Sequence, residues 1–250
     1  MQLKILTFNT WGGKSFNRER WPLIGKGITA LEPDLVGLQE VFQKDQAADL
    51  QKIAGISEIA FAGQESGLVT FSRFPIGASK TYCYQTVSPR ESYFRYCQIC
   101  RILPPDGEEF LFVVTHLSWK PEDASIREQQ VKELIGWIDA EGSPLPCILA
   151  GDFNATPDSD EIQLLAKAGF LDTFSSIHPD DPGYTWSHAN PYTASHPELP
   201  ERRIDHIFAR IPSKRTLMVQ ASKIVLNQPT AGGMFPSDHF GVFTILWLEN

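Results

Sequence analysis

The run Cys147-Ile148-Leu149-Ala150 is followed directly by Gly151-Asp152-Phe153-Asn154. Four apolar residues before a glycine are typical of a buried strand that ends in a loop. If the backbone stays extended past Gly151, Asp152 and Asn154 point the same way, because side chains alternate along a strand. A carboxylate and an amide aimed together from a strand end suit a water molecule and a phosphate oxygen. A polar exit from a strand is common, so this stretch alone does not fix the function.

Five other segments place Asn, Asp, Glu or His inside or at the end of an apolar stretch. They are Thr7-Phe8-Asn9-Thr10-Trp11, Leu38-Gln39-Glu40-Val41, Thr115-His116-Leu117, Arg203-Ile204-Asp205-His206 and Ser237-Asp238-His239. Uncompensated buried charge is costly, so such groups usually pair or bind a metal. In this order, the segments resemble those of the endonuclease/exonuclease/phosphatase superfamily, the deoxyribonuclease I-like metal-dependent phosphoesterases. The resemblance extends from Asn9 to His239.

The 250 residues can form one large domain or two small ones. Because the segments lie at both ends and in the middle of the chain, we expect one domain, residues 1–250, with a single site. Long series of strands with few helices favour two packed sheets over a doubly wound sheet. The resemblance implies the same α+β fold, a four-layer α/β/β/α sandwich of two mixed sheets flanked by helices.

Apolar runs and their spacing predict the individual elements. Helices are expected at 20–31, 123–140 and 160–168. Strands are expected at 3–8, 35–39, 68–72, 76–83, 93–103, 110–117, 147–150, 204–209, 217–225 and 240–248. Residues 172–202, rich in Pro, Ser and His, are expected to form a long surface loop, and loops of that length are often functional.

The chain carries a formal net charge of -8 and no Lys/Arg-rich run, and its densest basic spot is Arg202-Arg203. Proteins that follow a long polyanion usually carry a basic stripe, so extensive nonspecific binding to a nucleic-acid duplex is disfavoured. A short phosphodiester remains compatible, because a bound cation supplies local positive charge. The sequence contains no run of 18 apolar residues, so it does not predict a membrane-spanning helix. Met1–Phe8 enters a strand without a signal-peptide pattern, so we expect a cytoplasmic protein.

Cys97 and Cys100 have the spacing of a CxxC motif, but no second Cys/His pair with zinc spacing accompanies them. They lie in an expected strand, where residues three apart face opposite ways. We therefore expect buried free thiols rather than a zinc or redox site.

The expected metal ligands are oxygen atoms at strand ends. Glu40 ends an apolar strand, and a hard cation such as Mg²⁺ (or Mn²⁺) takes oxygen ligands. Glu40 is assigned as the principal ligand, Asn9 as its neighbour, and Asp238 as a further ligand, directly or through a water molecule. The alternative for Glu40 is a solvated residue that caps a helix at 42–50.

The expected catalytic pair is Asp205 and His239. Asp205 shares a strand face with Ile207, and a carboxylate on a core face needs a partner. The resemblance implies that His239 is this partner and acts as a general base or an acid/base at the phosphate, oriented by Asp205. It also implies that Asp152 positions the nucleophilic water or the leaving oxygen and that Asn154 holds a phosphate oxygen. Asp152 and His239 can exchange the role of activating water.

His116 also follows a strand, where a histidine is more often a hydrogen-bonded core residue than a catalyst. The Thr-His-Leu context resembles the deoxyribonuclease I and sphingomyelinase branches, which implies a catalytic role for His116 at the phosphate or leaving group. His206, on the opposite face from Asp205, is expected to be structural. Arg127 and Gln130 either reach the substrate or lie on a solvated helix face.

Base-repair members of the superfamily carry a second acidic ligand at the position of Trp11. The segment around Trp11 instead resembles the sphingomyelinase, deadenylase and bacterial phosphoesterase branches. Tyr184-Thr185-Trp186 resembles the family's aromatic wall beside the phosphate. Trp11, Trp119 and Trp186 are expected to stack on a base or sugar or to line a lipid-headgroup pocket, with packing under a loop as the alternative.

These features favour a divalent-metal-dependent hydrolase that cleaves phosphodiester (or phosphomonoester) bonds. A nuclease-like activity on a short or single-stranded nucleic acid is favoured. A sphingomyelinase-like lipid-headgroup or small-molecule phosphoesterase is the alternative. A non-catalytic binding module is remote, because the Glu, the Asp–Asn pair and the His are all present.

Overall fold

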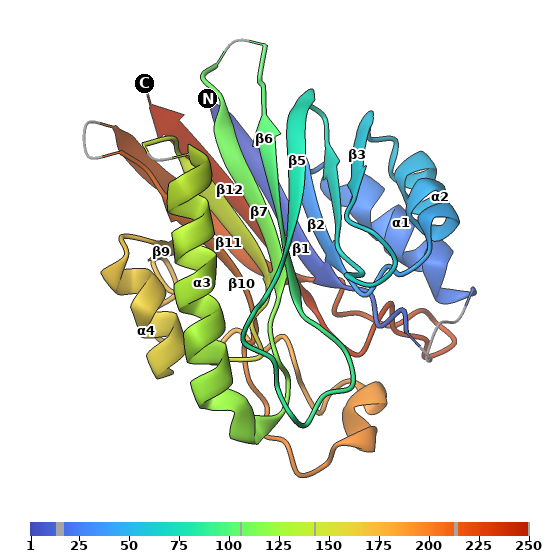
Figure 1. Ribbon diagram of the computed structural model, residues 1–250. Coiled ribbons are helices and arrows are strands. Elements are labelled where there is room, and N and C mark those ends of the chain that lie inside the picture. Colours follow the sequence, from blue (N-terminus) through green and yellow to red (C-terminus); the bar gives the residue numbers. More distant parts are fainter. Residues whose placement is uncertain (14–17, 106, 143, 213–214, 250) are drawn as a thin grey trace.

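The computed structural model describes residues 1–13, 18–105, 107–142, 144–212 and 215–249, and its strands form two sheets packed face to face (Figure 1). Within these residues, the first sheet has the order β11 (Thr216–Val225), β12 (Gly241–Glu249), β1 (Gln2–Asn9), β2 (Leu35–Gln39), β4 (Val69–Ser72) and β3 (Glu58–Phe61). The second has the order β5 (Ile76–Cys83), β6 (Tyr96–Ile102), β7 (Phe110–His116), β8 (Cys147–Asp152), β10 (Asp205–Arg210) and β9 (Leu171–Asp172). Each sheet is mixed, since β1 pairs with β2, and β7 with β8, in parallel.

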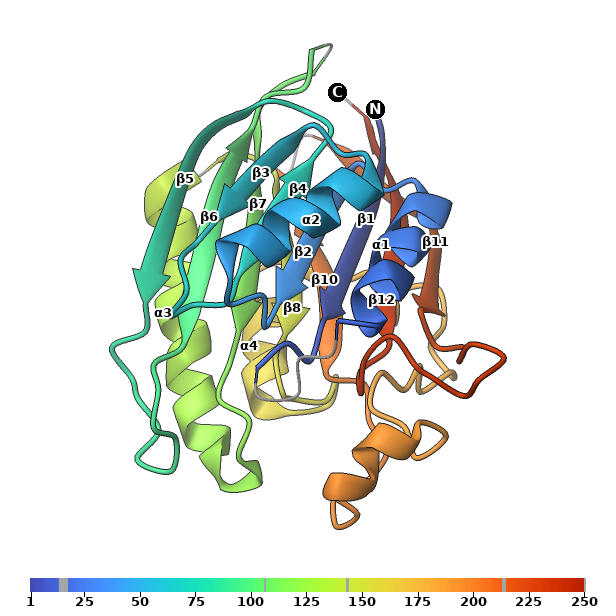
Figure 2. The same cartoon turned by 90° about the vertical axis from the view of Figure 1, so that its right-hand side faces the viewer.

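Helices cover the two outer faces of this pair of sheets (Figures 1 and 2). The helices α1 (Arg20–Leu31) and α2 (Lys44–Ala54) pack on the first sheet, and α3 (Ala124–Gly142) and α4 (Asp160–Lys167) pack on the second. Two short 3₁₀ helices, η1 (Pro121–Asp123) and η2 (Pro191–Ser195), lie in the connections. The predicted four-layer α/β/β/α sandwich is therefore confirmed. Among the described residues, no helix is both long enough and apolar enough to cross a bilayer.

Alternation along β7 shows how the layers are held together. Phe112 and Val114 point into the core between the sheets, whereas Leu111 and Val113 pack under α3. All four are buried, so the strand is apolar on both faces. Burying each such side chain contributes roughly 1.5–3 kcal/mol. This accounts for the continuous apolar run that the sequence shows.

Strands β3 and β9 were not predicted, and α2 entered only as the helix at 42–50 in the alternative reading of Glu40. Helix α2 buries only Ala47, Leu50 and Ala54, so its apolar stripe is weak. Strand β9 has two residues, too few for a periodic pattern. The four cysteines are free thiols, and Cys97 packs under α3 whereas Cys100 lies in the core between the sheets, so these two face opposite ways as expected.

Strand β8 extends two residues beyond the predicted end, through Gly151 to Asp152. A Cβ on Gly151 would lie 2.1 Å from the carbonyl oxygen of Thr115 on β7, so only glycine allows this close approach. The strand thus carries Asp152 to the edge of the sheet.

The parallel pairs decide where the polar strand ends meet. Both β1 and β2 end at one edge of the sandwich, and β7 and β8 end at the same edge of the second sheet. In register, Asp152 pairs with His116 on one side and with Asp205, the first residue of β10, on the other. This edge lies opposite the two chain termini (Figure 1).

Candidate active site

The polar residues at the strand ends line one cavity of about 430 Å³. Its lining includes Asn9, Glu40, His116, Asp152, Asn154, Asp238 and His239. These residues come from five of the six segments singled out in the sequence, and Asp205, from the sixth, lies in contact with His239. The fold therefore brings all six segments to one place.

The carboxylate of Asp152 is the hub of the cavity floor. Its Oδ2 atom accepts a hydrogen bond from Asn9 Nδ2 at 3.0 Å and lies 3.4 Å from His116 Nε2 and 3.8 Å from His239 Nε2. Its Oδ1 atom accepts from the backbone N–H of Asn154 at 2.9 Å. Side chains from both sheets thus converge on one buried carboxylate.

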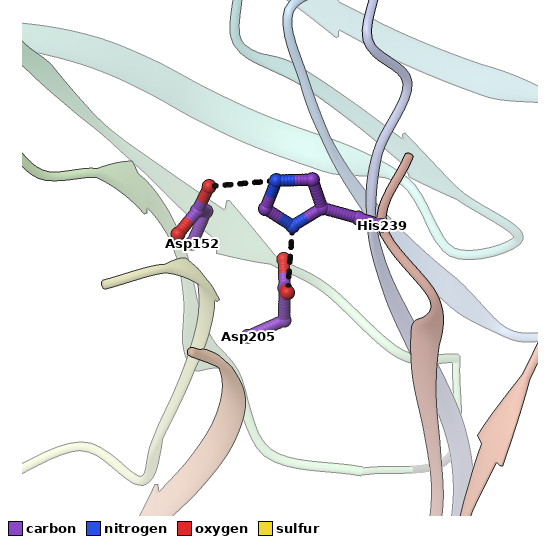
Figure 3. A group of neighbouring side chains, drawn as sticks. All are labelled: Asp152, Asp205 and His239. Atoms are coloured by element: carbon purple, nitrogen blue, oxygen red, sulfur yellow. Dashed lines mark hydrogen bonds and ion pairs between the residues drawn. The ribbon is translucent and has the colours of Figure 1, made fainter. Parts of the chain in front are cut away.

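Asp205 and His239 form the expected pair. His239 Nδ1 lies 2.9 Å from Asp205 Oδ2, so the imidazole sits between the carboxylates of Asp205 and Asp152 (Figure 3). Thr185 Oγ1 accepts hydrogen bonds from the backbone N–H groups of Ile204 and Asp205, which fixes the start of β10. Asp205 is fully buried, and this pairing fixes the imidazole with its Nε2 atom toward the cavity.

The charges in this cluster shift the pKa values of its members. Burial alone would lower the pKa of His239, but the carboxylates of Asp205 and Asp152 outweigh it and raise that pKa to about 10. Burial, with the nearby charge of Asp205, raises the pKa of Asp152 to about 6. Burial, with Arg95 and His239 beside it, lowers the pKa of His116 well below its ordinary value. At neutral pH the cluster therefore holds an imidazolium at His239 and a neutral imidazole at His116.

Three residues close together can also look like a metal site. Asp152, Asp205 and His239 offer ligand atoms within 4.8 Å of one another. However, His239 Nδ1 is already hydrogen-bonded to Asp205. The raised pKa of His239 also favours the protonated imidazole, which cannot bind a metal. This trio is better described as a proton-handling group.

A second acidic group fits a divalent cation. Glu40 and Asp238 both line the cavity, and burial together with the negative charge of Glu40 raises the pKa of Asp238 to about 7. Asn9 lies beside Glu40: its Nδ2 atom donates to Glu40 Oε1 at 3.3 Å, and its Oδ1 atom accepts from the backbone N–H of Trp11 at 3.0 Å. The carboxylates of Glu40 and Asp238 offer oxygen atoms of the kind that Mg²⁺ takes, and a cation there would relieve their mutual repulsion. The donor set therefore fits a hard divalent cation.

Glu40 reaches this position through an unusual backbone. It has a left-handed conformation, with φ of 62°, directly after β2. Gly12, in the loop after β1, lies against it, and a Cβ on Gly12 would be 1.9 Å from the Glu40 carbonyl oxygen. The loop and Glu40 can approach each other only because residue 12 lacks a side chain. Glu40 precedes α2, which begins at Lys44, and its side chain faces the cavity rather than capping that helix.

Asn154 reaches the cavity by a different route from the one expected. The strand ends at Asp152, and the φ of 51° at Asn154 is left-handed, so the extended backbone does not reach Asn154 and simple alternation does not apply. Asp152 and Asn154 nevertheless both line the cavity, because Asn154 turns back and donates from Nδ2 to the carbonyl oxygen of Leu117 at 3.1 Å. The second hydrogen of that amide is left for another acceptor.

Aromatic and basic side chains form the walls. Trp11 and Trp186 line the cavity, and the ring of Trp186 meets that of His239 edge-on at 5.2 Å. Wall residues that sequence reasoning did not assign are Tyr93, Arg95, His196 and Arg202. Arg202 was noted in the sequence as part of the densest basic spot, Arg202-Arg203, but the neighbouring residues did not show that its side chain faces the cavity.

Two residues discussed in the sequence analysis, Arg127 and His206, make structural contacts away from the cavity lining. Arg127 is buried and is not part of the cavity lining: Nε donates to Glu161 on α4 at 2.7 Å, and Nη1 donates to the carbonyl oxygens of Ser118 and Lys120. This corrects the expectation that it binds substrate, since its donors hold the start of α3 in place. His206 is fully buried and donates from Nε2 to the carbonyl oxygen of Ala155 at 2.9 Å, a structural contact as expected.

Sequence comparison agrees with this arrangement. The model of the endonuclease/exonuclease/phosphatase family matches residues 6–239. The chain belongs to this family. Mouse tyrosyl-DNA phosphodiesterase 2 is 26% identical over 96% of this chain and 66% of its own length. A putative neutral sphingomyelinase of Drosophila melanogaster is 28% identical over 99% of this chain and 61% of its own length. The chain thus spans about two thirds or less of these curated relatives.

Solved structures share the fold at low sequence identity. That of D. rerio TDP2 complexed with a single-strand DNA product has a TM-score of 0.84 at 19% identity, and the match covers 98% of this chain and 99% of that one. A family protein from Bacteroides thetaiotaomicron has a TM-score of 0.78 at 20% identity, over 100% of this chain and 98% of that one. Both likenesses concern the four-layer sandwich.

Proposed function

We propose that this chain is a divalent-metal-dependent phosphodiesterase with nuclease-like action on a short or single-stranded substrate. The observation that carries the proposal is the floor of the cavity, where Asn9, His116 and His239 surround Asp152 Oδ2. This places a buried carboxylate and an imidazolium side by side, beneath a cavity wide enough for a phosphate ester. The role of each site residue that follows is part of this proposal.

Asp152 and His239 have complementary roles, in which Asp152 orients the attacking water and His239 donates a proton. With a pKa of about 6, Asp152 is ionised at neutral pH and accepts a hydrogen bond from the attacking water, which it orients. His239, held by Asp205, keeps its proton on Nε2 and gives it to a phosphate or leaving oxygen. Asn154 donates its remaining amide hydrogen to a phosphate oxygen, and neutral His116 donates or accepts at the leaving group.

Glu40 is proposed as the principal ligand of Mg²⁺ or Mn²⁺, with Asn9 and Asp238 beside it. Such a cation supplies charge neutralisation to the nonbridging phosphate oxygens. Asn9 links this group to the proton-handling group, because its amide donates to both Glu40 and Asp152.

The nuclease-like preference is supported by relatives whose names concern DNA, tyrosyl-DNA phosphodiesterase 2 and the D. rerio TDP2 bound to single-strand DNA. The Drosophila putative neutral sphingomyelinase supports a second candidate, a lipid-headgroup phosphoesterase. We also propose that residues 1–250 act as one domain, since all six segments contribute to one site. The four free thiols support the proposed cytoplasmic location, where disulfides are rare.

An activity panel tests the proposal. Purified protein with Mg²⁺ or Mn²⁺ is offered single-stranded and duplex oligonucleotides, sphingomyelin vesicles, an inositol phosphate and bis(p-nitrophenyl) phosphate. We expect hydrolysis of the nitrophenyl diester and of the single-stranded oligonucleotide, abolished by a chelator. Cleavage of sphingomyelin alone would favour the second candidate, and no metal-dependent cleavage of any substrate would overturn the proposal.

A further inference from the structure

Two wall residues of the cavity, Trp186 and Arg202, are fixed to each other through their backbones. They form an isolated antiparallel bridge, in which each backbone N–H donates to the other's carbonyl oxygen at 3.0 Å. Residues directly opposite in such a bridge project their side chains to the same side. Both side chains line the cavity, which agrees with this rule. The bridge therefore presents an indole and a guanidinium as one unit.

The guanidinium of Arg202, which is partly buried, differs from those of the buried arginines around the site. Arg95 is held by Glu91, Arg127 by Glu161 and Arg203 by Asp172. Among the described residues, no hydrogen bond or ion pair reaches the Arg202 side chain, and its Nε is buried without a partner. The residue also borders a neighbouring hollow beside Asp158 and Asp181, but the carboxylates that favour its charge are Asp152 and Asp205. These neighbours place the guanidinium on the active-site side.

Trp186 supplies a second unused donor. Its indole Nε1 is buried and also lacks a partner within the described part of the chain. The centroid of its ring lies 5.2 Å from that of the His239 ring and 6.5 Å from that of the His196 ring. A buried donor without an acceptor costs free energy, and a partly buried cation without a partner costs more. Two such groups on one bridge call for an acceptor that none of the described residues supplies.

We propose that Trp186 and Arg202 bind a second anionic group of the substrate, the phosphate next to the one that is cleaved. The planar fork of a guanidinium matches phosphate oxygens, and an indole N–H can donate to the same group. Because Trp186 contacts His239, an anion bound there lies beside the scissile phosphate. The preferred substrate is then a nucleotide with two phosphates on one sugar, or a longer strand. A choline headgroup would instead bring a cation toward Arg202. This inference rests on the proposed phosphodiesterase function.

The first test compares two chromogenic substrates in saturating Mg²⁺. One is the p-nitrophenyl ester of thymidine 5′-phosphate, and the other is the same ester carrying a 3′-phosphate. We expect Arg202→Met to raise KM for the second substrate about 10- to 100-fold more than for the first, as for loss of a charge-assisted hydrogen bond. Arg202→Lys should recover part of the preference, and Trp186→Phe, which keeps a ring, should lose a smaller part.

Lys132→Met is the matched control, since Lys132 pairs with Glu128 on an exposed face of α3 and is not part of the cavity lining. This variant removes one positive charge and should keep the preference of the wild type. Equal changes in KM for both substrates in Arg202→Met would overturn the inference. So would a preference that Lys132→Met reduces as much as Arg202→Met does.

A binding measurement separates this inference from the proposed activity. Calorimetry with thymidine 3′,5′-bisphosphate and thymidine 5′-monophosphate needs no turnover. We expect the wild type to bind the bisphosphate more tightly, and Arg202→Met to remove most of that difference. If neither ester is hydrolysed but the difference is present, the proposed activity fails and the second anion site stands. If the two ligands bind equally well to the wild type, the site is refuted.

Discussion

Replacing Asp205 by Asn tests whether this carboxylate sets the protonation of His239. Asp205 Oδ2 lies 2.9 Å from His239 Nδ1, and both side chains are buried. The pKa of His239 is raised to about 10 from an ordinary 6.5. At 1.36 kcal/mol per pH unit, that difference corresponds to roughly 5 kcal/mol in favour of the imidazolium. Asp205 makes the largest carboxylate contribution to the raised pKa of His239, and Asp205→Asn removes it. The carboxylate of Asp152, 3.8 Å from His239 Nε2, then makes the largest remaining contribution.

We therefore expect Asp205→Asn to lower kcat about 1,000-fold at neutral pH and to move the alkaline limb of the pH profile toward lower pH. The sign follows from the charge: a histidine with a raised pKa stays protonated until the pH passes that raised value. In the wild type, activity should fall near pH 6, where Asp152 gains its proton, and near pH 10, where His239 loses its own. A cation bound at Glu40 shifts both limbs downward.

The assay is release of nitrophenolate from bis(p-nitrophenyl) phosphate over a pH series in saturating Mg²⁺. His239→Ala should lose about as much activity as Asp205→Asn or more, and the double variant should lie within about tenfold of His239→Ala, because the two residues act as a unit. The charge-matched control is Asp139→Asn. Asp139 is an exposed carboxylate that pairs with Arg210, and this variant should behave as the wild type. Losses that multiply to about a million-fold in the double variant would refute the coupling, as would an unmoved alkaline limb.

Three further predictions concern the fold and the substrate. Gly151→Ala places a Cβ 2.1 Å from the Thr115 carbonyl oxygen, so it should destabilise the protein by about 3 kcal/mol in urea unfolding; a loss below about 1 kcal/mol would contradict the required close approach. Asp172→Asn should cost about 2 kcal/mol at neutral pH. Burial would raise the pKa of Asp172, but His206 and Arg203 lower it, so this stabilisation is present above about pH 4 and is lost as the pH falls below that value. The difference from the wild type should therefore shrink in acid, and a constant difference would disprove the linkage. Binding of a single-stranded oligonucleotide to His239→Ala in saturating Mg²⁺ should show a log–log salt slope of roughly -1 to -3, and a slope of about -5 or steeper would mean that the fold assembles a basic surface.

The strands could be predicted because most are buried on both faces and read as apolar runs between Pro and Gly. Helix α2 appeared only as an alternative, at 42–50, since its buried residues are two alanines and Leu50, and its position depends on the sheet beneath it. The end of β8 was placed too early for a related reason. Gly151 looks like a break in the sequence, but in the fold it is the residue that lets β7 and β8 lie close together.

The floor of the site follows from the order of the segments, whereas its walls depend on contacts between distant residues. Nothing near Arg127 in the sequence shows that Glu161, on another helix, takes its guanidinium. Nor does the stretch between Trp186 and Arg202 show that its two ends pair. Residues 172–202 were expected to be a long surface loop, and within this stretch Trp186, Ser195, His196, Leu199 and Arg202 line the cavity.

The metal group provides the most direct measurement of the central claim, that metal and proton-handling groups act together on a phosphodiester. Mg²⁺ is titrated into the wild type and Glu40→Gln by calorimetry, and hydrolysis of bis(p-nitrophenyl) phosphate is followed in the same samples, with melting curves to check the fold. We predict that Glu40→Gln weakens Mg²⁺ binding at least about tenfold and slows hydrolysis about 100-fold or more, while the melting temperature stays near that of the wild type. Unchanged Mg²⁺ affinity in Glu40→Gln, or full wild-type activity in the presence of a chelator, would contradict the account.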